Sequence, residues 1–218
     1  MRDQPGLRLG TYYRIELLTR LGLACHGGVA VDVGGRDGRW LAGLEAARVL
    51  VDVDPVAALP SVCYVKASGD ALPLRGRSAD TVYSLDVIEH VPDESRLIAD
   101  AFRLLRPGGR MIMTTPSDDI RVFPRVTNRW IDRKWGHDRV RGFDAAYLET
   151  VVRKAGAGDV QVHRLAMRAF RLSYLPVRAL WSVDGRAGRA VTRLLARIDA
   201  RVPWGRRGAL LVIARSGS

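Results

Sequence analysis

Apolar runs alternate with segments of helical periodicity along most of the 218-residue chain. Strands buried on both faces of a sheet read as near-continuous apolar runs, whereas helices repeat apolar positions every three to four residues. By these criteria we expect strands at 29–33, 48–53, 62–66, 81–85, 110–115, 159–164 and 209–214. We expect helices at 10–21, near 37–46, from Pro55, near 94–106 and at 144–155. The helix near 94–106 is expected to end before Pro107 and the two glycines that follow it. This alternation predicts an α/β fold with a doubly wound, mostly parallel sheet.

Two segments are too long to be plain connections between these elements, namely 116–143 and 167–207. The length suits one domain, 1–218, in which both segments would shape a second site beside the sheet. No apolar run is long enough to span a bilayer, and the N-terminus has no apolar core typical of a signal peptide. The two cysteines have no metal-ligand spacing, so we expect free thiols, no metal site and a cytoplasmic protein.

The net charge of +12 is distributed unevenly. Residues 51–100 hold four Lys or Arg and nine Asp or Glu, whereas residues 151–218 hold fourteen and three. The acidic stretch coincides with the ends of the predicted early strands. The basic stretch indicates attraction of the C-terminal third to an anionic surface or substrate.

Carboxylates and glycines follow the first predicted strand, in "VAVDVGGRDG". Asp32 interrupts the apolar run, and Gly34, Gly35 and Gly38 come after it. Glycines there let the backbone approach a ligand where a Cβ would collide. An ordinary strand-to-helix turn is the alternative for this stretch taken alone.

The acids decide between possible ligands. Asp54 lies twenty residues beyond Gly34, about where nucleotide-binding folds place the acid that binds ribose hydroxyls. Asp70 could accept a hydrogen bond from an adenine amino group, and Asp32 could reach a positively charged amino group. Such a set would repel phosphates, which favour helix N-termini and cations. An adenosine that carries an amino acid and no phosphate fits better, and that ligand is S-adenosylmethionine.

Five motifs in order resemble the class I S-adenosylmethionine-dependent methyltransferases, specifically the type 11 group that includes the ubiquinone-type O-methyltransferases. They are "VDVGGRDG", "VLVDVDP", "GDALPL", "SLDVIEHVPD" and "LLRPGGRMIMTTP", and the resemblance covers roughly 25–165. It implies a seven-stranded Rossmann-like sheet, an N-terminal lid helix within 1–24, and insertions after strands five and six. It also implies that Ala71 and Asp86 contact the cofactor, along with the glycines and acids above.

One position departs from the pattern of this group. Arg36 stands where the group usually has glycine. A side chain there must point away from the cofactor, or it would fill the pocket for the methionine end. The substitution is the main argument for the alternative that the chain is a non-catalytic relative that binds S-adenosylmethionine or serves as a scaffold.

Methyl transfer to a hydroxyl is assisted by a base that removes the proton, and histidine suits this role because its pKa lies near 6.5. Among the four histidines, His90 follows the fourth strand and His137 lies in the expected lid, so these two are the candidates. A structural role is an equal alternative for each. Glu89 could contact the acceptor or cap the next helix, and Tyr12 and Tyr13 could reach the site from the lid helix or simply pack it.

Arginines recur at helical spacing within 186–201, opposite an apolar stripe that we expect to comprise Ala187, Ala190, Val191, Leu194, Leu195 and Ile198. Such a helix can lie on an anionic membrane or pack on the sheet with its arginines in water. The positions of the two candidate histidines lead us to expect O-methylation of a small-molecule, sugar or lipid-linked acceptor. The basic helix adds the hypothesis of peripheral contact of 167–207 with the inner face of the membrane. A nucleic-acid methyltransferase has support only from charge, and no nucleic-acid partner is expected.

Overall fold

The structure is a computed structural model that describes residues 9–56, 59–118 and 142–217. Backbone contacts divide the chain into two compact units, which we call the sheet unit and the helical unit. The sheet unit comprises 25–164 and 207–218, and the helical unit comprises 1–24 and 165–206. The expected lid segment and the expected second insertion therefore belong to one compact unit.

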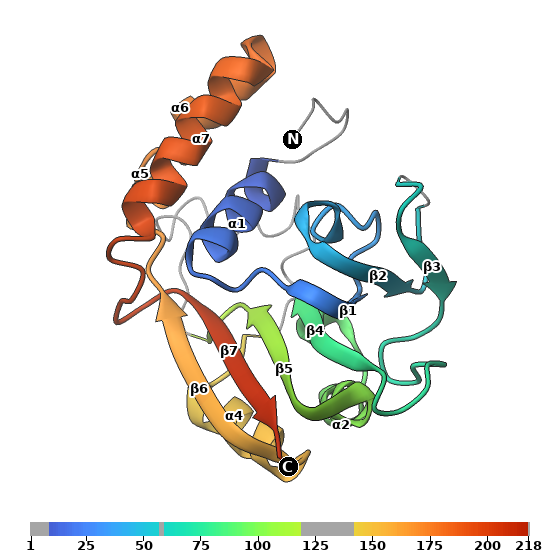
Figure 1. The fold of residues 1–218 in the computed structure, drawn as a ribbon. Coiled ribbons are helices and arrows are strands. Elements are labelled where there is room, and N and C mark those ends of the chain that lie inside the picture. Colours follow the sequence, from blue (N-terminus) through green and yellow to red (C-terminus); the bar gives the residue numbers. More distant parts are fainter. Residues whose placement is uncertain (1–8, 57–58, 119–141, 218) are drawn as a thin grey trace. The chain divides into compact units, whose positions relative to one another are not determined.

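The sheet unit contains a seven-stranded sheet in the order β3-β2-β1-β4-β5-β7-β6 (Figure 1). Its strands are β1 (His26–Val33), β2 (Glu45–Asp52), β3 (Cys63–Lys66), β4 (Ala79–Leu85), β5 (Leu105–Thr115), β6 (Ala157–Leu165) and β7 (Ala209–Ser216). Strands β1 to β5 pair in parallel, and β7 runs antiparallel to β5. The predicted α/β class and mostly parallel sheet are confirmed.

Two helices of the sheet unit pack on the sheet and on each other, α2 (Glu94–Leu104) and α4 (Ala145–Lys154) (Figure 1). Both begin at an aspartate whose side chain accepts hydrogen bonds from the first turn, Asp93 for α2 and Asp144 for α4. The core is formed by apolar side chains of the central strands and of these helices, such as Val82, Leu97 and Leu148.

Three helix predictions need correction. Between β1 and β2 the chain forms turns and a short 3-10 helix, η1 (Leu41–Gly43), rather than a helix over 37–46, because β2 already begins at Glu45. No described residue of 55–62 is helical, so the short helix from Pro55 is not found there. Helix α2 ends at Leu104, and Pro107 and the two glycines lie within β5 instead of closing the helix.

The helical unit contains α1 (Leu9–Arg20), α5 (Arg168–Leu172), α6 (Tyr174–Val183) and α7 (Gly185–Asp199). Helices α6 and α7 lie side by side, and α7 also contacts α1 and α5 (Figure 1). No helix in the described ranges is both long and apolar enough to cross a membrane.

Candidate active site

A cavity of about 250 Å³ lies at the carboxyl ends of β1, β2 and β4. Strand order changes direction here, since β2 lies on one side of β1 and β4 on the other. Ligands of open α/β sheets bind in the crevice at such a point. The described residues that line the cavity are Val33, Gly34, Val51, Asp52, Val53, Ala67, Ser68, Gly69, Asp86, Val87, His90, Val91 and Pro92.

The turn after β1 accepts only glycine at its first two positions. Gly34 has φ +78°, and a Cβ there would lie 2.5 Å from both methyl groups of Val87. A Cβ at Gly35 would overlap the Asp32 carboxylate. The Gly34 N–H donates to the carbonyl of Val51 at 2.7 Å, which ties the turn to β2. Gly34 lines the cavity, whereas Gly35 and Gly38 do not.

Arg36 adopts the left-handed backbone conformation that glycine favours, with φ +48°. Its N–H donates to Asp52 Oδ2 at 3.0 Å, and its carbonyl accepts from the N–H of Val56 at 2.7 Å. The side chain is exposed and does not line the cavity. The arginine therefore leaves the cavity lining unchanged.

Asp32 is a buried carboxylate beneath the glycine turn, with 1% of its surface exposed. Within the described part of the chain, its Oδ1 has no hydrogen-bond partner. Burial raises the pKa of Asp32 to about 8, with smaller contributions from the negative charges of Asp37 and Asp52. A positively charged ligand group near this carboxylate would favour its ionised form.

The two acids at the end of β2 differ in their positions. Asp52 lines the cavity and accepts hydrogen bonds from the backbone N–H groups of Arg36 and Asp54 at 3.0 and 2.9 Å. Asp54, the predicted ribose-binding acid, is exposed and lies outside the described cavity lining. Asp52 was not predicted as a site residue, because the twenty-residue spacing from Gly34 selects Asp54 alone, although both aspartates are present in "VLVDVDP".

The loop after β3 contributes Ser68 and Gly69 to the cavity. The Ser68 hydroxyl donates to the carboxylate of Asp70, which with Ala71 lies just beyond the lining residues. Neither Ser68 nor Gly69 was predicted, because a serine and a glycine in a polar loop carry no distinctive spacing.

The segment after β4 brings two predicted residues to the cavity, Asp86 and His90. Asp86 has φ +55°, and its Oδ1 accepts from the Thr114 hydroxyl at 2.8 Å. His90 is exposed at the cavity rim. Glu89 is buried and accepts from the Thr115 hydroxyl at 3.0 Å. Since Asp93 caps α2, the alternative of Glu89 as the helix cap is wrong.

The sequence profile of a family described as a methyltransferase domain matches residues 10–162. The chain belongs to this methyltransferase family. The methyltransferase is 28% identical over 179 residues to a ubiquinone biosynthesis O-methyltransferase of Cereibacter sphaeroides, a match that covers 78% of this chain and 70% of the relative. The resemblance to class I S-adenosylmethionine-dependent methyltransferases is thereby confirmed.

Solved structures with the same fold include a phosphoethanolamine N-methyltransferase of Haemonchus contortus in complex with S-adenosylmethionine, at TM-score 0.66 and 15% identity. That match covers 99% of this chain and 59% of the other. A methyltransferase of Thermotoga maritima gives TM-score 0.65 at 19% identity, covering 95% and 90% of the two chains. At these identities the comparison establishes the fold.

The cofactor of the methyltransferase is S-adenosylmethionine, and the cavity suits its charge. Asp52 and Asp86 line the cavity, and its described lining contains no Lys or Arg. The unpartnered Oδ1 of Asp32 lies buried behind the glycine turn. Carboxylates without a basic side chain favour a cationic ligand and disfavour a diphosphate, so these residues fit a sulfonium and an ammonium group.

The remaining predicted residues lie elsewhere. Tyr12 and Tyr13 are buried within the helical unit, where the Tyr12 hydroxyl accepts from Arg193 at 2.9 Å. Tyr13 donates to Asp199 at 2.7 Å, and its ring stacks on Phe170 with centroids 3.8 Å apart. These contacts pack α1 against α5 and α7. His137 lies outside the described residues.

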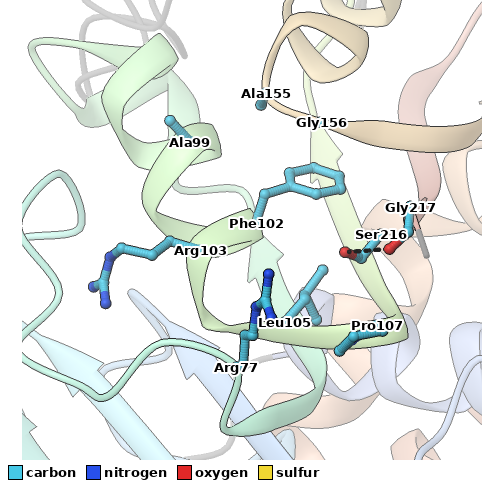
Figure 2. A pocket seen from close by; sticks show the side chains of 10 residues that line it. All are labelled: Arg77, Ala99, Phe102, Arg103, Leu105, Pro107, Ala155, Gly156, Ser216 and Gly217. Carbon is cyan, nitrogen blue, oxygen red and sulfur yellow. Dashed lines mark hydrogen bonds between the residues drawn. The ribbon is translucent and has the colours of Figure 1, made fainter.

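A second cavity of the sheet unit, about 420 Å³, contains none of the predicted site residues (Figure 2). Its apolar side chains are those of Ala99, Phe102, Leu105, Pro107 and Ala155. Figure 2 shows Arg103 pointing away from the other lining side chains, because its guanidinium is held by Asp100 and by the carbonyls of Leu72 and Leu74. This second cavity lies at the end of β7 and the start of β5, away from the glycine turn. The smaller cavity is therefore the candidate active site.

Proposed function

We propose that the methyltransferase methylates a hydroxyl oxygen of a small-molecule, sugar or lipid-linked acceptor, with His90 removing the hydroxyl proton. The observation that carries the proposal is that His90 lines the same cavity as Gly34, Asp52 and Asp86. The name of the relative from Cereibacter sphaeroides, a ubiquinone biosynthesis O-methyltransferase, supports oxygen as the acceptor atom.

The residues of the chain divide into binding and proton-transfer roles. Asp32 and Asp52 favour the cationic parts of the cofactor, and we assign Asp54 to the ribose hydroxyls and Asp70 to the adenine amino group. S-adenosylmethionine, when bound, supplies a methyl group on a positively charged sulfur. His90, exposed at the rim, is positioned to hold an acceptor hydroxyl and to take its proton.

The test measures S-adenosylhomocysteine formation with a panel of phenolic, sugar and lipid-linked hydroxyl acceptors. With an active acceptor, His90→Gln should lower kcat about a hundredfold while leaving the Kd for S-adenosylmethionine nearly unchanged. The control is His163→Gln, on β6 and outside the cavity lining. His137→Gln belongs in the same panel, since His137 is the second candidate base.

The pH profile separates a base from a structural histidine. A base gives an acid limb in kcat near its pKa, which should disappear in His90→Gln. Full turnover in both His90→Gln and His137→Gln would contradict histidine assistance and favour positioning alone, which also suits N- or C-methylation.

We propose further that the helical unit contacts an anionic membrane through 167–207. Residues 165–206 hold nine arginines and two aspartates. Large apolar side chains are exposed among them, namely Leu172, Leu175, Val183, Leu194, Ile198, Val202 and Trp204. The predicted apolar stripe of α7 is only partly buried: Leu195 packs inward, whereas Leu194 and Ile198 are exposed. Apolar side chains beside arginines suit a bilayer surface.

Not all of these arginines are available to lipids. Arg193 donates to Tyr12 and approaches Glu16 at 3.4 Å, whereas Arg197 and Arg201 are exposed. Each basic residue near an anionic leaflet contributes about 1 kcal/mol, and salt weakens the attraction. A few arginines and inserted side chains suffice for reversible binding.

Co-sedimentation with vesicles tests this surface. The wild type should bind phosphatidylglycerol vesicles but not phosphatidylcholine vesicles, and less at high salt. A Leu172→Ser/Val183→Ser variant, which alters two side chains that are each 87% exposed, should bind several-fold less. The control is Val56→Ser, 44% exposed in the sheet unit and outside the cavity lining. Equal recovery in the supernatant with both lipids at low salt would exclude membrane contact.

A further inference from the structure

The second cavity of the sheet unit, of about 420 Å³, lies at the other end of the strands from the candidate active site. Its lining comes from the loop before β4, the start of β5, the end of β7 and the ends of α2 and α4. No residue is common to the described linings of the two cavities. A cavity of this volume is within the range that accommodates a small molecule.

Arg77 brings a positive charge without a partner into this cavity. Its backbone N–H donates to the carbonyl of Arg103 at 2.9 Å, but its guanidinium makes no hydrogen bond or ion pair with the described residues. Figure 2 shows the Arg77 side chain pointing toward Phe102, whereas Arg103 points away. The described lining contains no Asp or Glu. The charge of Arg77 is therefore not neutralised within this lining.

Two carboxylates near this part of the chain are already engaged by other arginines. Asp80 accepts from Arg106 at 2.8 Å. Asp100 accepts from Arg103 at 2.6 Å, which explains why that arginine turns out of the cavity. Neither carboxylate is shared with Arg77, so its guanidinium remains available to an anionic ligand.

The backbone at Arg77 is strained and firmly held. Its φ of +53° lies in the left-handed region, which a residue with a Cβ adopts at an energetic cost. The N–H groups of Arg77 and Ser78 donate to the carbonyls of Arg103 and Leu104 at 2.9 and 2.8 Å, which ties the loop to the end of α2. Strain of this kind gathers at ligand sites, where it fixes the direction of a side chain.

We propose that this cavity binds a small organic carboxylate with an apolar body, and that Arg77 holds the carboxylate group. A guanidinium presents a planar fork that matches two carboxylate oxygens, and such charge-assisted hydrogen bonds are among the stronger ones in proteins. The Ser216 hydroxyl also lines the cavity, where its contact with the Gly217 carbonyl is long at 3.4 Å. This hydroxyl can therefore turn toward the ligand.

The lining also decides what kind of anion fits. One guanidinium in the described lining is unpaired, which balances a single negative charge better than a phosphate dianion. The apolar side chains of the lining, with the ring of Phe102 among them, favour an apolar body beside the charge. The preference is opposite to that of the active-site cavity, whose described lining holds carboxylates and no arginine.

Binding is measured by calorimetry with phenylacetate, which combines a carboxylate with an aromatic body. Phenylacetamide, which has no charge, and acetate, which has no apolar body, are the reference ligands at equal ionic strength. The wild type should bind phenylacetate at least tenfold more tightly than either, and Arg77→Gln should weaken this binding about tenfold or more. Arg75→Gln is the matched control, because Arg75 is an exposed arginine of the same loop that lies outside the lining.

Nuclear magnetic resonance locates the ligand in the wild type. Phenylacetate should shift the backbone N–H signals of Gly156 and Gly217, which line the cavity, and saturating S-adenosylmethionine should not displace it. Unchanged S-adenosylmethionine binding in Arg77→Gln would show that the sheet unit is intact. The proposal is overturned if phenylacetate does not bind, if phenylacetamide binds equally well, if both arginine variants lose the same affinity, or if S-adenosylmethionine displaces the ligand.

Discussion

Replacing Asp32 by asparagine is expected to stabilise the methyltransferase increasingly as the pH rises from about 5 to about 8. Asp32 is buried, and burial raises the pKa of its carboxyl group to about 8. In the unfolded chain the same group has its ordinary pKa of about 3.9. Between these two pKa values the folded state binds more protons than the unfolded state. The free energy of unfolding therefore falls as the pH rises through this window.

The size of the effect follows from the width of the window. Each pH unit between the two pKa values lowers the unfolding free energy by about 1.4 kcal/mol, so the loss from pH 5 to pH 8 reaches up to roughly 4 kcal/mol. Asparagine keeps the shape of the side chain and cannot ionise, so the variant does not incur this loss. The diagnostic quantity is the slope of stability against pH, because a swap of oxygen for an amide changes the absolute stability as well.

Urea unfolding at four pH values between 5 and 8 measures this slope for the wild type, Asp32→Asn and Asp159→Asn. Asp159 is an exposed aspartate on β6, so its variant should follow the wild type at every pH. The difference between Asp32→Asn and the wild type should grow by several kcal/mol across the range. A difference that stays constant with pH would refute the conclusion that Asp32 is protonated in the folded state at neutral pH.

Three other substitutions test the site and the packing. Arg36→Gly should raise the unfolding free energy by about 1 kcal/mol relative to Arg36→Ala, because φ +48° strains any residue with a Cβ. Urea unfolding of both variants measures this difference. Equal stability of the two variants would contradict the strain. Asp54→Ala should weaken S-adenosylmethionine binding roughly ten- to a hundredfold in calorimetry; if only Asp52→Ala does so, the ribose assignment moves to Asp52. Tyr13→Phe should lower the unfolding free energy by about 1–3 kcal/mol, because it removes the hydroxyl that donates to the buried carboxylate of Asp199. A decrease in unfolding free energy of less than a few tenths of a kcal/mol would show that this hydrogen bond contributes little.

The strands of the sheet could be predicted because their burial leaves a direct trace in the sequence. Residues 29–33 and 81–85 are mostly apolar, and they lie within the buried strands β1 and β4. The ends of helices were harder to predict, because the apolar periodicity of α2 continues past Leu104 into residues that belong to β5. The helix expected near 37–46 failed for a similar reason: Trp40, Leu41 and Leu44 are buried, but from a turn rather than from a helix face.

Contacts between residues far apart in the sequence could not be predicted from local apolar patterns. The hydrogen bond from Tyr13 to Asp199 joins positions 186 residues apart, and nothing in either local sequence indicates it. The aromatic pair of α1 was therefore open to a role in the site, although in the structure it packs the helical unit. The buried face of α7 also differs from the predicted stripe, because Gly188 and Thr192 pack inward against Trp181 while Leu194 is exposed.

The arginine in the glycine motif shows how a departure at the sequence level can be local in its effect. Arg36 lies in a left-handed turn that lets its N–H reach Asp52. Glycine adopts this conformation without strain, whereas arginine adopts it at an energetic cost. Since the side chain is exposed and absent from the cavity lining, the cost falls on stability rather than on the shape of the cavity. The substitution is therefore no argument for a lost active site. A non-catalytic relative would instead be expected to show changes at the residues that line the cavity, and there Gly34, Asp52, Asp86 and His90 are all present.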